Sequence, residues 1–423
     1  MRHYLDALPN GLKVISVPVP TSESVTVTVW VGVGSRNETD RISGISHFLE
    51  HMVFKGSKKR PSAFEIANAV DAIGGEFNAS TSKEWTNFYI KARNVHLEKA
   101  FDVLSDMVLN PLIPSKDLER EKGVIIEEIG MYEDTPMWKV PDLFENIIFK
   151  GNSLGRDIIG TKKTVTSFER KDFVDYRNKF YGSNNLCLTV SGGVKRDEVK
   201  RLSEKYFGDL KRVESKVQEE FKPLKNTKKL IISQKQKEQA HFVLGFLAGK
   251  MDDKNRIKEK VLSTILGGGM SSRLFTEVRE KRGLAYSVRS STERFVDTGY
   301  LDIYAGVDPK RVKEAIKVTL DECYKIANGK GKVTKGELEK AKEYLKGHMA
   351  LSLEDSKNIN TFFGVRQALL GKVETLESVF KAIDETTPDD IVKVAGKVLR
   401  PEGVFLAIVG PYKNKKEFEN LLK

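Results

Sequence analysis

Two of the six histidines in the chain lie one helical turn apart, at positions 47 and 51. The apolar residues around them recur at helical spacing, which predicts an amphipathic helix: Ile45, Phe48, Leu49 and Met52. On such a helix His47, Glu50 and His51 project to the same side. Two imidazoles one turn apart can bind the same metal ion, and zinc is the usual choice. The tract is therefore a candidate metal site.

Glu50 directly precedes the second histidine of this tract. At that position its carboxylate can take a proton from a metal-bound water, which is the task of a general base in metal-assisted hydrolysis. The order H-x-x-E-H is the inverted form of the zincin motif and favours hydrolytic chemistry. The alternative interpretation is an ordinary helix whose two histidines only cover a polar face.

A catalytic zinc ion also needs a third protein ligand and one open position. A downstream segment, DLEREKGVIIEEIGMYEDTP, predicts a helix on which Glu121 and Glu128 share one face. Glu127 is turned away from Glu128 by about 100°. We expect Glu128 to be the third ligand and Glu121 to support a ligating histidine or a water. The alternative is that these acids belong to a solvated helix surface.

Three tracts resemble the M16 family of zinc metallopeptidases: GISHFLEHMVFKG, EREKGVIIEEIGMYEDTP and LGGGMSSRLFTEVREKRGLAYSV. The resemblance covers essentially the whole chain and is to the short members of the family, which have two homologous domains and include the mitochondrial processing peptidases. It implies one zinc ion per chain, held by His47, His51 and Glu128. It also implies that Glu50 is the general base and that Glu121 is a supporting acid.

The resemblance gives a role to Arg279 and Tyr286 in the second half. By chemistry alone, a guanidinium and a phenol seven residues apart can hydrogen-bond a peptide carbonyl or stabilise its oxyanion. The alternative is a surface arginine near a packed tyrosine. Family members bring such a pair to the substrate, so we expect Arg279 and Tyr286 to act in the active site of a partner chain.

A further implication of the resemblance is a strand that binds the substrate. An exposed edge strand binds an extended peptide through main-chain hydrogen bonds, with little selectivity for sequence. The expected substrate-binding residues are Phe77, Asn78, Ala79, Ser80 and Thr81.

The chain contains an internal repeat. The segments LCLTVSGGVKRDEVKRL and VFLAIVGPYKNKKEFENLL, near the ends of the two halves, both read as an apolar strand, a glycine turn and an amphipathic helix. A charged stretch, roughly residues 211–229, is typical of a linker between them. We expect an N-terminal zinc-binding domain of residues 1–215 and a homologous C-terminal domain without zinc of residues 216–423.

Short apolar and alternating segments predict the strands. They are Leu12–Pro18, Val25–Gly34, Glu76–Ser80, Trp85–Ala92 and Leu186–Gly192 in the first half, and Leu230–Ser233, His241–Leu247, Ala285–Ser291 and Tyr300–Gly306 in the second. The strands come two by two between helices and not in regular βαβ succession. The expected fold class is α+β, with two homologous sandwich domains that are each a mainly antiparallel sheet with helices packed on one face.

The composition excludes several classes of protein. The 423 residues are 39% hydrophobic and have a net charge of +12, but basic and acidic residues are interspersed, so we expect no nucleic-acid partner. No apolar run approaches the ~18–20 residues of a membrane span, and the start of the chain lacks a secretory signal pattern. We expect no membrane association. The two cysteines form no paired motif, and a cytoplasmic location is expected.

The expected function is that of a zinc-dependent endopeptidase that cleaves peptides or unfolded, presequence-like segments inside a clamshell chamber. The resemblance implies that two chains form this chamber, as a homodimer or as a heterodimer with a homologous chain. The competing interpretation is a non-catalytic structural or regulatory subunit of the same fold. Such subunits commonly lose ligand positions, whereas every position matches in this sequence.

Overall fold

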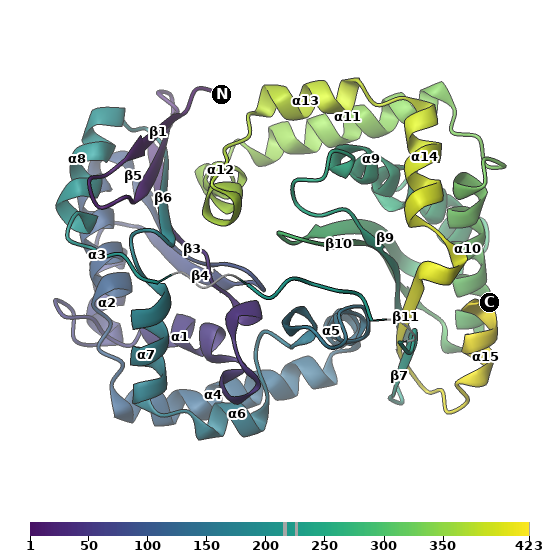
Figure 1. Cartoon of the computed structure of the whole chain (residues 1–423), viewed down its shortest axis with the longest axis horizontal. Helices are drawn as coiled ribbons and strands as arrows, with labels where there is room; N and C mark the ends of the chain where they lie inside the picture. Colours follow the sequence, from purple (N-terminus) through teal and green to yellow (C-terminus); the bar gives the residue numbers. More distant parts are fainter. Residues whose placement is uncertain (215–217, 225–226, 423) are drawn as a thin grey trace. The chain divides into compact units, whose positions relative to one another are not determined.

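The computed structural model describes residues 1–214, 218–224 and 227–422. They form two compact units (Figure 1). The first unit consists of Met1–Ile129, Arg156–Glu219 and Leu351–Thr375, and the second of Gly130–Gly155, Glu220–Ala350 and Leu376–Lys423. Each unit thus includes a segment from the other half of the sequence, which the repeat did not predict. The predicted boundary between residues 215 and 216 lies outside the described residues.

Six of the described strands of the first unit form one sheet in the order β1-β2-β6-β3-β5-β4. Neighbouring strands are antiparallel, except that β2 and β6 are parallel. The strands are β1 (Tyr4–Ala7), β2 (Lys13–Pro18), β3 (Ser24–Val31), β4 (Glu76–Thr81), β5 (Thr86–Arg93) and β6 (Leu186–Gly192). The helices are α1 (Ile45–Val53), α2 (Ala63–Asp71), α3 (Leu97–Leu109), α4 (Ser115–Asp134), α6 (Lys162–Ser167), α7 (Arg170–Phe180), α8 (Arg196–Phe207) and α12 (Ser356–Leu370).

The sheet of the second unit has the order β7-β11-β8-β10-β9 with β7 and β11 parallel. This sheet repeats the order β2-β6-β3-β5-β4, without a counterpart of β1 among the described strands. Its strands are β7 (Leu230–Gln234), β8 (Ala240–Ala248), β9 (Ala285–Arg294), β10 (Gly299–Val307) and β11 (Val404–Gly410). Its helices are α5 (Pro136–Ile148), α9 (Arg256–Gly267), α10 (Val312–Ala327), α11 (Lys335–Ser352), α13 (Leu376–Asp384), α14 (Pro388–Val398) and α15 (Lys416–Glu419). The predicted α+β class with two mainly antiparallel sheets is therefore confirmed.

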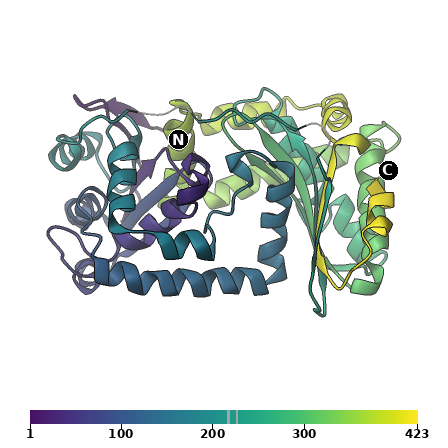
Figure 2. The same ribbon diagram turned by 60° about the horizontal axis from the view of Figure 1, so that its bottom comes forward.

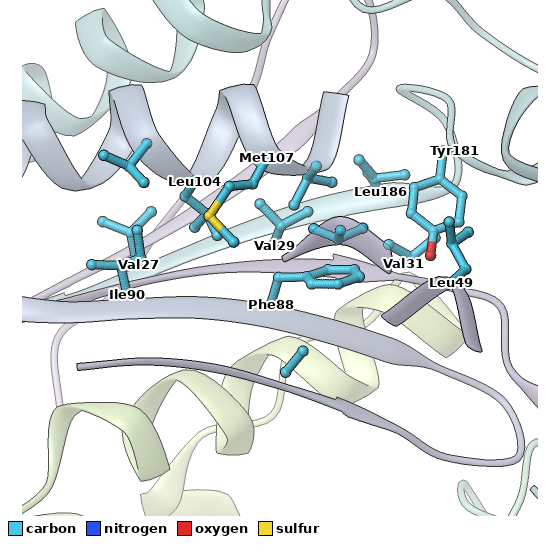
Figure 3. Packing of buried hydrophobic residues seen from close by; sticks show 14 of the residues in the cluster. Val27, Val29, Val31, Leu49, Phe88, Ile90, Leu104, Met107, Tyr181 and Leu186 are labelled. Atoms are coloured by element: carbon cyan, nitrogen blue, oxygen red, sulfur yellow. The ribbon is translucent and has the colours of Figure 1, made fainter. Parts of the chain in front are cut away.

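One face of the first sheet forms the main core of that unit. Along β3 the side chains of Val27, Val29 and Val31 point to this face and are fully buried. Figure 3 shows Leu104 and Met107 of α3 packed above them. Fully burying an aliphatic side chain of this size stabilises the fold by about 1.5–3 kcal/mol, so this layer holds the elements around the site in place.

The opposite face of the first sheet is covered by α12. Helices therefore pack on both faces of this sheet, whereas the sequence predicted helices on one face only. The side-chain amide of Asn360 donates hydrogen bonds to Thr26 O, Thr28 Oγ1 and Thr189 O, at 2.9, 2.9 and 3.0 Å. In the second unit α5 packs against β8 and β11 in the equivalent way. Among the described residues, none of the helices combines the length and the apolar character that crossing a bilayer requires.

Candidate metal centre

A buried carboxylate fixes the start of α1, the helix that contains the H-x-x-E-H tract. The N-cap residue Gly44 has a left-handed φ of 96°, and a Cβ atom there would lie 2.7 Å from Ile159 O. Only glycine suits this position. Glu38 accepts hydrogen bonds from the N–H groups of Gly44 and Ser46, at 2.7 and 2.8 Å. Glu38 thus satisfies main-chain donors that the first turn of a helix leaves without partners. It was not among the residues predicted from the sequence.

Burial raises the pKa of Glu38 to about 7, although its hydrogen bonds to Ser46 and Gly44 act in the opposite direction. In the unfolded chain this carboxyl group titrates near 4.5. Between these two values the native protein binds a proton that the unfolded chain has released, so the free energy of unfolding falls as the pH rises.

We therefore expect the melting temperature of the zinc-free protein to fall between pH 5 and 7.5, and Glu38→Gln to remove part of that slope. Differential scanning calorimetry on both proteins measures the effect. Melting curves with the same pH dependence in both would contradict the role given to Glu38.

The structure brings His47, His51 and Glu128 together. Glu128 lies on α4, which Figure 2 shows as one uninterrupted helix. Its Oε2 atom lies 3.7 Å from Nε2 of His47 and 3.7 Å from Nε2 of His51. Ligand atoms of the three residues all lie within 4.8 Å of one another. Among the described residues, His47, His51 and Glu128 form the one group of three or more His, Cys, Asp or Glu side chains close enough together to hold a metal ion.

The geometry of this group fits a zinc ion. Separations of 3.7 Å are too long for hydrogen bonds. Ligand atoms bound to one tetrahedral zinc ion at about 2.0–2.1 Å lie about 3.3 Å apart, so a small contraction would complete the coordination. Burial and, to a smaller extent, the charge of the neighbouring His51 together lower the pKa of His47 to about 3. The His47 imidazole is therefore neutral at pH 7, as a metal ligand must be.

Glu121 lies behind His51 and orients it. Its Oε2 atom is 3.2 Å from Nδ1 of His51, and its Oε1 atom pairs with Nζ of Lys55 at 2.6 Å. A carboxylate at Nδ1 keeps the proton on that nitrogen and leaves Nε2 free to bind a metal. Lys55 was not among the residues predicted from the sequence, although its place four residues after His51 was a signal. Nδ1 of His47, by contrast, is buried without a hydrogen-bond partner among the described residues.

Glu50 lies beside the three ligands with its carboxylate held by Thr81. The Thr81 hydroxyl donates a hydrogen bond to Oε2 of Glu50 at 2.5 Å. Burial raises the pKa of Glu50 and the nearby Glu128 carboxylate acts in the same direction, whereas the bond from Thr81 and the neighbouring His51 oppose them. A raised pKa brings a carboxylate closer to the range in which a general base works at neutral pH.

The predicted substrate strand, Phe77–Thr81, forms most of β4 at the edge of the first sheet. Among the described strands β4 pairs with β5 alone. The side chains of Asn78 and Ser80 are exposed, and the Phe77 ring lies 5.5 Å from that of Phe54, just after α1. The edge strand therefore runs next to the helix of the candidate metal centre.

Arg279 and Tyr286 lie together in the second unit. Arg279 is part of the helical turn Phe275–Glu280, and Tyr286 lies on β9, the edge strand of the second sheet. The guanidinium carbon lies 5.2 Å from the centre of the Tyr286 ring, a cation–π distance. The tyrosine is 76% exposed.

Both halves of the chain match models of known protein families. Residues 13–162 match the model of "Insulinase (Peptidase family M16)", and residues 167–345 match that of "Peptidase M16 inactive domain". The chain belongs to the M16 peptidase family. His47, Glu50, His51 and Glu128 lie within the first match, and Arg279 lies within the second.

Similar proteins in this family are named zinc proteases. An uncharacterized zinc protease of Streptomyces coelicolor is 37% identical, over 97% of this chain and 90% of the relative. One of Bacillus subtilis is 38% identical, over 90% of this chain and 91% of the relative. The crystal structure of a protease from Helicobacter pylori has a TM-score of 0.89 at 26% identity, covering 96% of this chain and 99% of that one.

A chain of Complex III2 from Candida albicans has the same fold. It has a TM-score of 0.84 at 20% identity and covers 99% of both chains. Likeness at this level of identity shows the fold alone.

Proposed function

We propose that this chain is a zinc-dependent endopeptidase. The observation that supports it most is the convergence of two imidazole nitrogens and one carboxylate oxygen beside Glu50. The names of the relatives agree with this at the level of the family. When bound, one zinc ion per chain would lower the pKa of a water molecule and polarise the scissile carbonyl. His47, His51 and Glu128 would hold it.

In this proposal Glu50 takes the proton from the attacking water and passes it to the nitrogen of the leaving amine. Glu121 keeps His51 in the tautomer that binds metal. The peptide lies extended along Phe77–Thr81 and pairs with the main chain of β4. Because this pairing needs an extended main chain, the substrates are peptides or unfolded segments.

Arg279 and Tyr286 complete the site from a partner chain in this proposal. Both side chains are hydrogen-bond donors that can bind the peptide carbonyl or the oxyanion that develops from it. The partner is a second copy of this chain or a homologous chain.

A mixture of two inactive variants tests the proposal. We expect Glu50→Gln and Arg279→Ala each to hydrolyse a peptide library poorly, and a 1:1 mixture to regain activity as mixed dimers form. Such dimers contain one site with both groups intact. Size-exclusion chromatography of differently tagged chains verifies that mixed dimers form.

Mixed dimers without recovered activity would contradict the partner role of Arg279. If the unmodified protein contains no zinc and hydrolyses nothing, it is a non-catalytic subunit instead.

A further inference from the structure

We propose that Thr81 is a positioning residue for Glu50, so that the strand that binds the peptide also orients the general base. This inference rests on the proposed peptidase function. Thr81 is the last residue of β4, and its Oγ1 atom lies 2.5 Å from Oε2 of Glu50. Among the described side chains, it is the hydrogen-bond partner of this carboxylate.

The bond fixes the direction of the Glu50 carboxylate. A glutamate loses considerable rotamer entropy when its carboxylate is fixed, and a hydrogen bond to one oxygen offsets that loss. Because Thr81 occupies Oε2, the other oxygen of Glu50 is available to a water molecule. The hydroxyl therefore selects both the direction of the carboxylate and the oxygen that accepts the proton.

Thr81 is itself held by a turn that packs against main chain. The turn after β4 begins at Ser82, whose carbonyl accepts a hydrogen bond from Ser35 N–H at 3.2 Å. The carbonyl of Lys83 accepts one from Arg36 N–H at 2.7 Å. A Cβ atom at Gly34 would lie 2.2 Å from Ser82 O, so the turn lies directly against the backbone of Gly34.

Buried charges fix the same turn. Glu84 pairs with Arg36 at 2.5 Å, and their side chains are 2% and 1% exposed. Nζ of Lys83, also buried, donates a hydrogen bond to Arg156 O at 2.6 Å. Burying charged groups is costly unless they are well paired, and removing one partner is strongly destabilising. The end of β4 is therefore held rigidly, and Thr81 presents its hydroxyl from a fixed place.

The hydroxyl should therefore affect turnover and not the affinity for peptide. A peptide pairs with the main chain of β4, which a change of the Thr81 side chain leaves intact. The position of the base, in contrast, depends on the hydroxyl. A small misplacement of a catalytic group can lower the rate about 10²-fold.

Thr81→Val, which keeps the shape and removes the hydroxyl, and Thr81→Ser, which keeps the hydroxyl, test the inference. We expect kcat for a fluorogenic peptide to fall about 10–100-fold in the valine variant, with KM changed less than about two-fold. The serine variant should keep most of the activity, and zinc content should be unchanged in both. Thr166→Val on α6 is a matched control, because its exposed hydroxyl bonds only to carbonyls of its own helix.

A double-mutant cycle with Glu50→Asp, whose shorter side chain cannot keep the bond, completes the test. Thr81→Val should have little further effect on kcat in that background. The inference would be overturned if Thr81→Val lowered kcat in the Glu50→Asp background as much as in the unmodified protein. It would also be overturned if Thr81→Val alone left kcat unchanged, whether or not it raised KM. In those cases the unmodified protein still hydrolyses peptide. Zinc-loaded protein without any hydrolysis would instead overturn the proposed function, and this inference with it.

Discussion

Glu50→Gln should lower peptide hydrolysis by about 10²–10⁴-fold while the zinc content stays at one ion per chain. The amide has nearly the same shape as the carboxylate but cannot accept a proton from water. Zinc should be retained because Glu50 is not among the three residues whose ligand atoms converge. Steady-state kinetics on a fluorogenic peptide and metal analysis by mass spectrometry measure the two effects.

Glu127→Gln is the matched control for this substitution. Glu127 is exposed on α4, next to Glu128 in sequence but turned away from it. The control should keep both activity and zinc. If the Glu50→Gln protein is as active as the control, Glu50 is not the general base.

Glu128→Gln should remove the zinc ion itself. A neutral amide replaces the only anionic ligand of the proposed set. The affinity for zinc should therefore fall by more than the roughly 10–100-fold that is typical when a residue hydrogen-bonded to a ligand is replaced. Activity should fall with metal occupancy, and excess zinc should restore part of it. Competition with a chromophoric chelator measures the affinity.

Two further variants determine which glutamate binds the ion. Glu127→Gln should bind zinc as the unmodified protein does, and Glu121→Gln should show an intermediate loss, since Glu121 acts through His51. An unchanged affinity in Glu128→Gln, together with loss of zinc in Glu121→Gln, would make Glu121 the ligand.

Local periodicity was sufficient to predict α1 and most strands. Ile45, Phe48, Leu49 and Met52 were expected on the apolar face of the helix, and all four are fully buried. The strand predicted at Leu186–Gly192 has those bounds in the structure. The strand predicted from Val25 to Gly34 is three residues too long, because β3 ends at Val31. These features depend on neighbours in sequence, so the sequence is enough to find them.

The helix that covers the opposite face of the first sheet could not be predicted from local periodicity. In β3 valines alternate with Thr26, Thr28 and Trp30, a pattern typical of a strand with one solvated face. All of these side chains are buried, because α12 covers this face. Ser356 of α12 hydrogen-bonds the Thr26 hydroxyl at 2.7 Å, and Asn360 of α12 donates a hydrogen bond to the Thr28 hydroxyl at 2.9 Å. That helix lies more than 300 residues later in the chain, and no local pattern connects the two.

The candidate site also combines features that local sequence predicts with contacts from distant parts of the chain. The i,i+4 spacing of His47 and His51 and the shared face of Glu121 and Glu128 are regular features of helices, and they were enough to nominate the metal centre. Glu38 and Thr81 act on α1 from outside it, through hydrogen bonds to its first turn and to Glu50. Such contacts become visible only in three dimensions.

The most direct test of a zinc peptidase is to remove the metal from the unmodified protein. We predict one zinc ion per chain as purified, loss of peptide hydrolysis after chelation and dialysis, and recovery of activity on addition of about one equivalent of zinc. Hydrolysis that survives complete removal of the metal, or a zinc-loaded protein that cleaves no peptide, would contradict the assignment of this chain as a zinc peptidase.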